Sequence, residues 1–229
     1  DVHGSVASRE TPPLSARNQI LGNIRTRLGR ETGDPVPVDE RLTTHPAGPL
    51  PGRGEGTAEE LRVRFVEMAR KSSADVEQLG GIEELPGLVA EICGAHGFDA
   101  AAAIAPDPAF EALRWSDAGV SVEARRGQPD DSLSVGHAVC GVAETGTLVL
   151  ASGPQSPITL SFLPDVHVVA LPADAIVGMY EEAWARMRAR GDMPRAINWI
   201  TGPSRSADIE QTLQLGAHGP IRLVIALYG

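Results

Sequence analysis

Short apolar runs alternate with amphipathic segments along most of this chain, and that alternation limits its fold more than any other feature. The run Val166–Leu171 is almost wholly apolar, which is typical of a strand buried on both faces of a parallel sheet. A second apolar run, Ile221–Leu227, lies close to the end of the chain. Strands separated by helices predict an α/β fold with a mixed, mostly parallel sheet covered by helices on both faces.

The other elements follow from hydrophobic periodicity and from capping and turn residues. Strands are expected at residues 99–104, 120–123, 147–151 and 196–201, and the apolar run 136–144 fits either a helix or a strand. Helices are expected at residues 57–78, 84–96, 106–113, 173–190 and 206–213. The first of these helices begins at Thr57-Ala-Glu-Glu60, which has the pattern of a capping box.

The first 56 residues differ from the rest of the chain in composition. Leu14–Leu28 has apolar residues at helical spacing with Ser15 as a candidate cap, and residues 29–56 are rich in proline and glycine. We therefore predict an N-terminal arm over residues 1–56, made of a helix at about 14–28 and an extended connector. The arm is expected to pack on its own domain or on another subunit, and residues 57–229 form one α/β domain.

Composition and charge exclude several classes of partner. The chain has 42% hydrophobic and 22% charged residues, as soluble globular proteins do. Its net charge of −10, with no cluster of lysine and arginine, disfavours nucleic acid and anionic membranes as partners. No apolar stretch reaches the roughly 18 residues that span a bilayer, and no segment resembles a signal peptide. We expect a cytoplasmic protein.

The chain offers few ligands for a metal or a cofactor. Cys93 and Cys140 are too few for a disulfide framework, or for an iron–sulfur cluster or zinc site built from four cysteines. The six histidines lack the spacing typical of metal ligands, and no Gly-x-Gly-x-x-Gly loop is present. We therefore expect no metal and no cofactor bound by this chain itself, and we interpret Cys140 as a small core residue.

Four segments resemble the lactate-utilisation protein C family, the LUD domain: Ala143–Leu150, Leu163–Val168, Thr201–Glu210 and Gly216–Pro220. The resemblance covers most of the chain. It implies a fold like that of the group formed by ribose-5-phosphate isomerase, glucosamine-phosphate deaminase and CoA-transferase. It also implies a role in the oxidation of L-lactate to pyruvate beside iron–sulfur partner proteins, which would hold the clusters.

The segment Glu144-Thr-Gly-Thr147 is the first candidate site. Gly146 allows close backbone approach or a positive φ, and the hydroxyls of Thr145 and Thr147 are suited to bind carboxylate or phosphate oxygens. Glu144 is a candidate base, or a nucleophile as in the CoA-transferase-like relatives that the resemblance implies. The structural alternative is a tight turn before a strand, with Glu144 accepting bonds from backbone N–H groups.

The loop after the strand at 196–201 is the second candidate. Gly202, Ser204 and Arg205 follow a strand and precede an expected helix, a geometry suited to oxyanion binding. Arg205 is the better anion partner, because its guanidinium pairs with a carboxylate at two points. Asp208, in the first turn of that helix, partly offsets the helix dipole and is expected to hold Arg205 or a backbone turn. Alternatively, Ser206 caps the helix and the loop is structural.

The turn Gly216–Pro220 is the third candidate. His218 is either a proton carrier near neutral pH or a structural histidine bonded to the neighbouring loop, and Gly219 with Pro220 fixes its backbone. His137 and His167 are weaker candidates, since one lies in an apolar run and the other at the start of a strand.

Together these segments predict a polar cleft that binds a small anionic metabolite, or a phosphorylated or CoA-like ligand, in a component of L-lactate utilisation. Whether the chain is itself an enzyme stays open. One alternative is a non-catalytic assembly or regulatory subunit, and another is a stand-alone acyl- or phosphosugar-converting enzyme by fold analogy. Iron–sulfur proteins are the expected partners, and a homo-oligomer is one option for the assembly.

Overall fold

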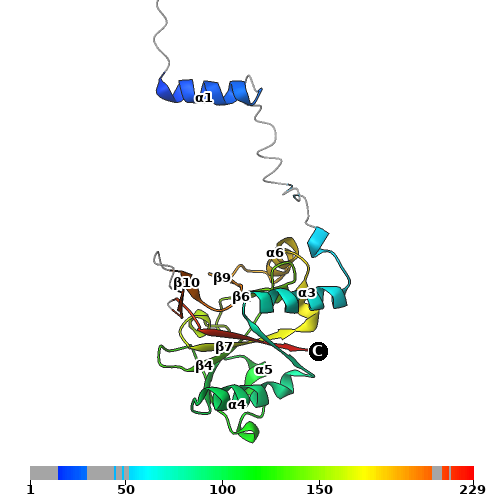
Figure 1. The fold of residues 1–229 in the computed structure, drawn as a ribbon, viewed down its shortest axis with the longest axis vertical. Coiled ribbons are helices and arrows are strands. Elements are labelled where there is room, and N and C mark those ends of the chain that lie inside the picture. Colours follow the sequence, from blue (N-terminus) through cyan, green and yellow to red (C-terminus); the bar gives the residue numbers. More distant parts are fainter. Residues whose placement is uncertain (1–14, 30–43, 45–47, 49–51, 208–212, 217) are drawn as a thin grey trace, which may run out of the picture. The chain divides into compact units, whose positions relative to one another are not determined.

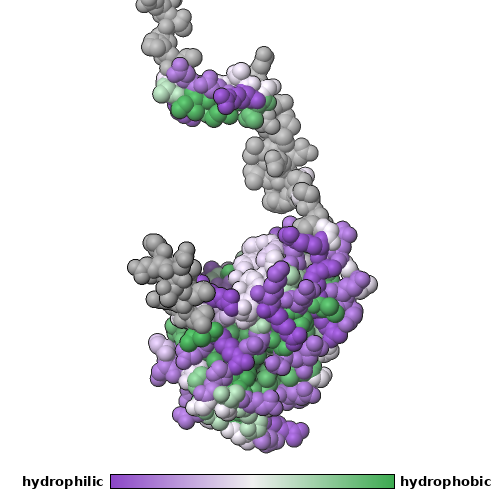
Figure 2. Space-filling model, in the orientation of Figure 1, coloured by the Kyte–Doolittle hydropathy of each residue, from purple (hydrophilic) through white to green (hydrophobic). Residues whose placement is uncertain are grey.

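The computed structural model describes residues 15–29, 44, 48, 52–207, 213–216 and 218–229. The chain divides into two compact units, residues 1–49 and 50–229. In the first unit, α1 spans Ala16–Arg27, and the Ser15 side chain accepts a hydrogen bond from the Asn18 N–H at 3.4 Å, as the capping pattern predicts. Ile20 and Ile24 on this helix and the C-cap residue Leu28 are exposed. Figure 2 shows apolar surface along this helix. The arm boundary at residue 56 stays a prediction.

The second unit is built on a six-stranded sheet in which every pair of neighbouring strands is parallel. Its strands, in spatial order, are β1 (Asp75–Leu79), β12 (Arg222–Tyr228), β7 (Val166–Pro172), β4 (Leu133–His137), β2 (Ala101–Ile104) and β3 (Ser121–Ala124). The strands β7 and β12 are central and almost fully buried, as their apolar runs predict. The predicted α/β class is confirmed.

Helices cover one face of this sheet. They are α4 (Leu85–His96) and the short α5 (Pro108–Glu111), beside the single turns η2 (Ile82–Glu84) and η3 (Ser116–Ala118). Figure 1 shows α4 and α5 together on one side of β4 and β7. Val89 and Phe110 pack there against Val168 of β7. The Trp115 indole N–H donates to the Phe110 carbonyl at 2.8 Å, so the only polar group of this buried side chain has a hydrogen-bond partner.

The other face is covered by α3 (Ala58–Lys71) and by a second sheet (Figure 1). That sheet has the strand order β8 (Ile176–Val177), β5 (Cys140–Val142), β6 (Thr147–Ala151) and β9 (Ile197–Ile200). Phe65 and Ala69 of α3 lie in one core with Leu148 of β6 and Leu171 of β7. On its outer side the second sheet packs against α6 (Tyr180–Ala189) through Met187 and its neighbours. Sequence periodicity did not predict this second layer.

The remaining described elements are short: η1 (Gly52–Gly54), η4 (Ile158–Ser161), η5 (Ala173–Ala175), and β10 (Arg205–Ala207) paired antiparallel with β11 (Leu213–Leu215). No helix among the described residues has both the length and the apolar character that crossing a bilayer requires.

Three predicted helices are wrong in part. The helix predicted over 57–78 ends at Lys71, because Ser73 adopts a φ of +66° and the chain then enters β1. The helix predicted over 173–190 begins only at Tyr180, after η5 and β8. In place of the helix predicted over 206–213 the described residues form β10 and β11, while residues 208–212 lie outside the described part. The ambiguous run 136–144 is β-structure, with β5 and the turn that follows it.

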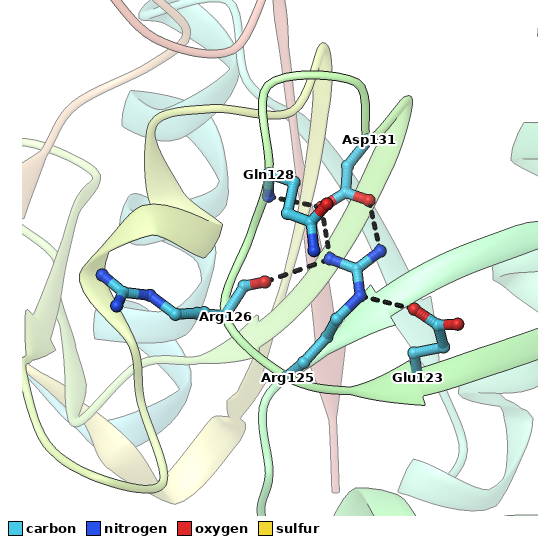
Figure 3. Close-up of polar contacts among 5 residues, drawn as sticks. All are labelled: Glu123, Arg125, Arg126, Gln128 and Asp131. Atoms are coloured by element: carbon cyan, nitrogen blue, oxygen red, sulfur yellow. Dashed lines mark hydrogen bonds and ion pairs between the residues drawn. The ribbon is translucent and has the colours of Figure 1, made fainter.

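An arginine clamp fixes the connection between β3 and β4 (Figure 3). The Arg125 guanidinium donates to both carboxylate oxygens of Asp131, at 2.7 and 2.9 Å, and also to Glu123. The same loop carries Gly127, where a Cβ would lie 2.7 Å from the Thr159 carbonyl oxygen. The clamp therefore holds the loop against η4, and Ser161, the last residue of η4, lines the cavity described below. The hydrogen bonds that the Asp131 carboxylate accepts from Arg125 lower the pKa of Asp131.

Two turns of the chain touch the backbone of α3 or of its C-cap residue Ser72 so closely that only glycine fits. Gly146 has a φ of +68°, and a Cβ there would lie 2.2 Å from the Ala69 nitrogen. Gly202 has a φ of +78°, and its Cβ would lie 2.1 Å from the Ser72 carbonyl oxygen. Both glycines bring their loops directly against the helix.

We expect Gly146→Ala to lower the free energy of unfolding by about 2 kcal/mol or more, since it combines a left-handed backbone with a clash against α3. Gly94→Ala is the matched control, because Gly94 lies in α4 and a Cβ there meets nothing within 4 Å. The control is expected to gain about 0.5–1 kcal/mol from helix propensity. Urea denaturation of the two variants measures both changes, and equal stabilities would contradict this account of the α3 contact.

Candidate functional site

A cavity of about 230 Å³ opens between the loops that follow β9 and precede β12. It lies at the amino-terminal ends of β7 and β12, since His167 is the second residue of β7 and Pro220 comes just before β12. Ligands of open α/β sheets usually bind at the carboxyl ends of the strands, whereas this cavity lies at the opposite edge of the sheet. The cavity is lined by Ser161, Phe162, His167, Trp199, Ile200, Thr201, Gly202, Pro203, Ser204, His218, Gly219, Pro220 and Leu223.

Ser204 joins the two loops that form the cavity. Its backbone N–H donates to the Pro220 carbonyl at 2.9 Å, and its own carbonyl accepts from the Gly216 N–H at 3.3 Å. Its side-chain oxygen accepts from the His218 N–H at 3.3 Å. The structure thus brings together Gly202, Ser204, His218 and Gly219, which the sequence placed in two separate candidate segments.

Arg205 is not among the described residues that line the cavity. Arg205 follows Ser204 directly, begins β10 and is exposed. His218 is exposed although it lines the cavity. Asp208 lies outside the described residues. Because the chain continues from Ser204 into β10, the argument for an oxyanion site at a helix N-terminus does not apply to this loop.

A cluster of hydroxyl groups links the hairpin between β5 and β6 to the cavity. The Thr147 Oγ1 lies 2.6 Å from the Thr145 Oγ1, 3.0 Å from the Tyr180 hydroxyl and 2.6 Å from the Thr201 Oγ1. Thr147 is fully buried, and Thr201 lines the cavity. Thr145 and Thr147 are therefore connected to the cavity through Thr201 rather than exposed in it.

Glu144 is held away from the cavity lining by an ion pair. Its side chain is buried, and its carboxylate accepts from the Arg53 Nε at 2.6 Å and also contacts the second guanidinium nitrogen. The Glu144 backbone N–H donates to the Gly178 carbonyl at 3.1 Å. The partner of the carboxylate is thus an arginine from η1, and not the backbone N–H groups of the structural alternative.

The three glycines predicted as site residues, Gly146, Gly202 and Gly219, differ in how tightly they are packed. Gly146 and Gly202 fit their loops against α3, as described above, so their conformations have a packing reason. At Gly219, in contrast, a Cβ would meet its nearest neighbour, the Ser204 Cβ, at an ordinary 3.5 Å. The cavity wall at Gly219 therefore has room for a methyl group.

His167, one of the weaker candidates from the sequence, forms part of the cavity wall. It is 1% exposed, and within the described structure neither ring nitrogen has a hydrogen-bond partner. Burial lowers its pKa to about 3. A single histidine in an otherwise apolar central strand was the signal available in the sequence, because a buried polar group normally has a partner.

Several other cavity residues were not selected from the sequence. Thr201, Ser161 and Phe162 line the cavity, while Tyr180 completes the hydroxyl cluster from α6. Thr201 begins a segment that carried the family resemblance. The contributions of Ser161, Phe162 and Tyr180 depend on contacts between distant segments, so no local pattern marked them. Trp199 packs against Tyr180 and Trp184, each with ring centroids 5.2 Å apart, and it also lines the cavity.

The remaining titratable candidates do not join this cavity. His137 ends β4 at the carboxyl edge, with its Nδ1 3.5 Å from Asp107, and burial lowers its pKa. Cys93 and Cys140 are buried free thiols, and burial raises the pKa of Cys140 to about 11. In the part of the chain that the structure describes, no three His, Cys, Asp or Glu side chains are grouped so that they would hold a metal.

Comparison with known proteins establishes the family. Residues 62–228 match the LUD domain, which covers most of the chain. The chain therefore belongs to the LUD domain family, and the resemblance predicted from its motifs is confirmed.

Several curated relatives match shorter segments. An uncharacterised protein of Neisseria meningitidis serogroup B is 43% identical over 89 residues, which are 38% of each chain. Proteins called lactate utilization protein C are 43% identical over 81 residues in Anoxybacillus flavithermus and 33% identical over 121 residues in Bacillus licheniformis. These two matches span 35% and 51% of this chain, and 36% and 50% of the relatives' own length.

A solved structure supports the fold. A DUF162 family protein from Deinococcus radiodurans superposes with a TM-score of 0.57 at 22% sequence identity. The superposition covers 76% of this chain and all of the other. At this identity the similarity is evidence for the fold alone.

The buried His167 predicts a loss of stability in acid. Between pH 6.5 and about 3 the imidazole is protonated in the unfolded chain but neutral in the folded one, so stability falls as the pH falls. The contribution is about 1.4 kcal/mol per pH unit over that window. We expect His167→Phe to show a correspondingly shallower pH dependence in urea denaturation at pH 7, 6 and 5.

His218→Gln is the control for this measurement, because His218 is exposed. It is expected to keep the pH dependence of the natural protein. His137 also has a lowered pKa and contributes in the same direction, so the difference between each variant and the natural protein isolates a single histidine. Identical pH profiles for the natural protein and His167→Phe would show that the imidazole is not held neutral.

Proposed function

We propose that this chain is a component of a cytoplasmic L-lactate utilisation system and binds a small anionic metabolite in the cavity between the β9 and β12 loops. The oxidation of lactate to pyruvate would take place together with iron–sulfur partner proteins that carry the electrons. The single observation that supports a binding role most strongly is that two segments far apart in sequence, 201–204 and 218–220, line one cavity. The names of the LUD domain relatives support the metabolic context.

Each polar group of the site has a proposed role. The exposed Arg205 guanidinium would neutralise the carboxylate of the ligand at the cavity entrance, since its two parallel donors suit that group. The Ser204 hydroxyl would donate a hydrogen bond, although it already accepts one from the His218 N–H. Thr145 would act through Thr147 and Thr201 by fixing the direction of the hydroxyl that faces the cavity.

Of the two proposed proton carriers, His218 has the more suitable position. It lines the cavity and is exposed, so its imidazole would be open both to a ligand and to solvent. Glu144 is buried against Arg53 and would serve mainly to hold the hairpin between β5 and β6 in place. We therefore propose His218 as the group that would transfer a proton and Glu144 as a positioning residue.

The assembly alternative rests on a different observation. The α1 helix carries three exposed large apolar side chains, and such a face is typical of a helix that binds a partner. If the chain is only an assembly subunit, deletion of the arm will abolish complex formation, whereas substitutions in the cavity will have no effect on lactate oxidation. A stand-alone acyl- or phosphosugar-converting enzyme is supported only by fold analogy.

Reconstitution separates these functions. We expect the purified chain alone to give no lactate-dependent dye reduction, and the chain with its iron–sulfur partners to give it. Arg205→Ala is expected to reduce that activity at least about tenfold, because it removes a charge-assisted pair with the ligand. Arg188→Ala, which removes an exposed arginine of α6 away from the cavity, is the control and is expected to retain activity.

Ligand binding tests the metabolite itself. L-lactate, pyruvate, CoA and ribose 5-phosphate are titrated by calorimetry into the protein and into Arg205→Ala. Binding of lactate or pyruvate that is weakened by the substitution supports the proposal. Binding of CoA or the sugar phosphate in place of either acid, or dye reduction by the chain alone, would overturn it.

A further inference from the structure

His167 has an environment that a structural histidine would not need. It lies on β7 with its side chain in the wall of the cavity, fully buried, and both of its ring nitrogens are without a partner in the described structure. The register partner of His167 on β4 is Ser134, whose hydroxyl donates to the Leu160 carbonyl at 2.6 Å. Two residues further along β4 is Gly136, where even a Cβ would approach the His167 Nε2 to 3.2 Å. The sheet therefore leaves space for the imidazole, but none of its described groups hydrogen-bonds to the ring.

An unsatisfied imidazole in this position destabilises the fold. Burying a polar group without a hydrogen bond is unfavourable, and an apolar side chain of similar volume would avoid that loss. The neighbours of His167 in this strand are apolar, with Val166, Val168 and Val169 all buried. A histidine retained here is thus explained by a partner that comes from outside the chain, through the cavity that it lines.

The charge of the cavity limits what that partner is. Among the described residues that line it there is no Lys, Arg, Asp or Glu. Two arginines adjoin lining residues along the chain. Arg222 precedes Leu223 and is paired with Asp75, whereas Arg205 follows Ser204 and is exposed. A carboxylate deep in this cavity would lack a counter-charge. A carboxylate at the entrance would lie near Ser204, which Arg205 follows in the sequence. The group that reaches His167 is therefore uncharged and polar.

We propose that His167 binds the oxygen on carbon 2 of a small 2-hydroxy or 2-keto acid, while the carboxylate of that acid stays at the entrance near Ser204 and Arg205. This inference rests on the proposed function and specifies which atom of the ligand enters the cavity. The volume of about 230 Å³ accommodates a ligand of this size, since a water molecule occupies about 30 Å³ in the liquid. His167 is then a specificity residue that distinguishes such acids from simple carboxylates.

The neutral state of the ring suits this role. A neutral imidazole has one N–H donor and one acceptor nitrogen, and a hydroxyl group both donates and accepts hydrogen bonds. Burial keeps the ring neutral at pH 7, so it binds the oxygen without a charge of its own. A ring that resists protonation is a weak proton acceptor, so proton transfer is left to the exposed His218.

The experiment compares two carboxylates that differ in one oxygen. L-lactate and propionate are titrated by calorimetry into the natural protein and into His167→Phe. We expect the natural protein to bind L-lactate about tenfold more tightly than propionate, the effect of one good hydrogen bond. The variant is expected to bind both acids equally, at the affinity that the natural protein has for propionate. Its melting temperature is expected to be equal to or higher than that of the natural protein.

Two controls keep this result interpretable. Val169→Ala removes a buried side chain two positions along the same strand, so it is expected to lower stability and leave the preference for lactate intact. If His167→Phe does not fold, the ring nitrogens of the natural protein are observed directly by ¹⁵N NMR. A shift of the His167 resonances with L-lactate and not with propionate supports the inference, and an equal response to both acids contradicts it.

The outcomes separate this inference from the function on which it rests. Equal binding of both acids by the natural protein, or a preference for lactate that persists in His167→Phe, overturns the role of His167 and leaves the proposed function in place. A variant that is destabilised and loses both acids shows a structural histidine, which also overturns it. Failure of the natural protein to bind lactate or pyruvate at all overturns the proposed ligand, and the inference with it.

Discussion

The contact between α3 and two glycine turns is the constraint on which the rest of this structure depends. Gly146 and Gly202 touch the backbone of α3 or of its C-cap residue Ser72 so closely that a single methyl group would clash with it. That contact fixes the hairpin between β5 and β6, and the loop after β9, relative to the six-stranded sheet. The cavity exists because the loop that leaves Gly202 then runs past the amino-terminal ends of β7 and β12.

The cavity that results has both exposed and buried residues in its lining. His218 and Thr201 of its lining are exposed, whereas Ser161 and His167 are buried. The proposed small acid would bind with its carboxylate in contact with water and its uncharged end inside, because transferring a carboxylate into an apolar cavity is strongly unfavourable. The Arg53–Glu144 pair stabilises the neighbouring hairpin, whose hydroxyl cluster reaches the cavity through Thr201.

Sequence reasoning located the elements whose signals are local. The capping box at Thr57 and the apolar runs of β7 and β12 lie where the sequence predicts. It failed where a tertiary contact decided the structure. The β1 strand has only one fully buried residue, Val76, so its pattern did not distinguish it from the end of a helix. It forms a strand because β12 offers a parallel edge for its backbone groups.

The sequence by itself determined the α/β class, the family and the two loop segments that contribute to the cavity, because periodicity and short motifs depend on neighbours along the chain. Only the tertiary structure decided that the cavity lies at the amino-terminal edge of the sheet, that Glu144 is bound by Arg53, and that His167 is in the cavity wall. Each of these depends on the distance between segments far apart in sequence, and no local pattern of residues specifies such a distance.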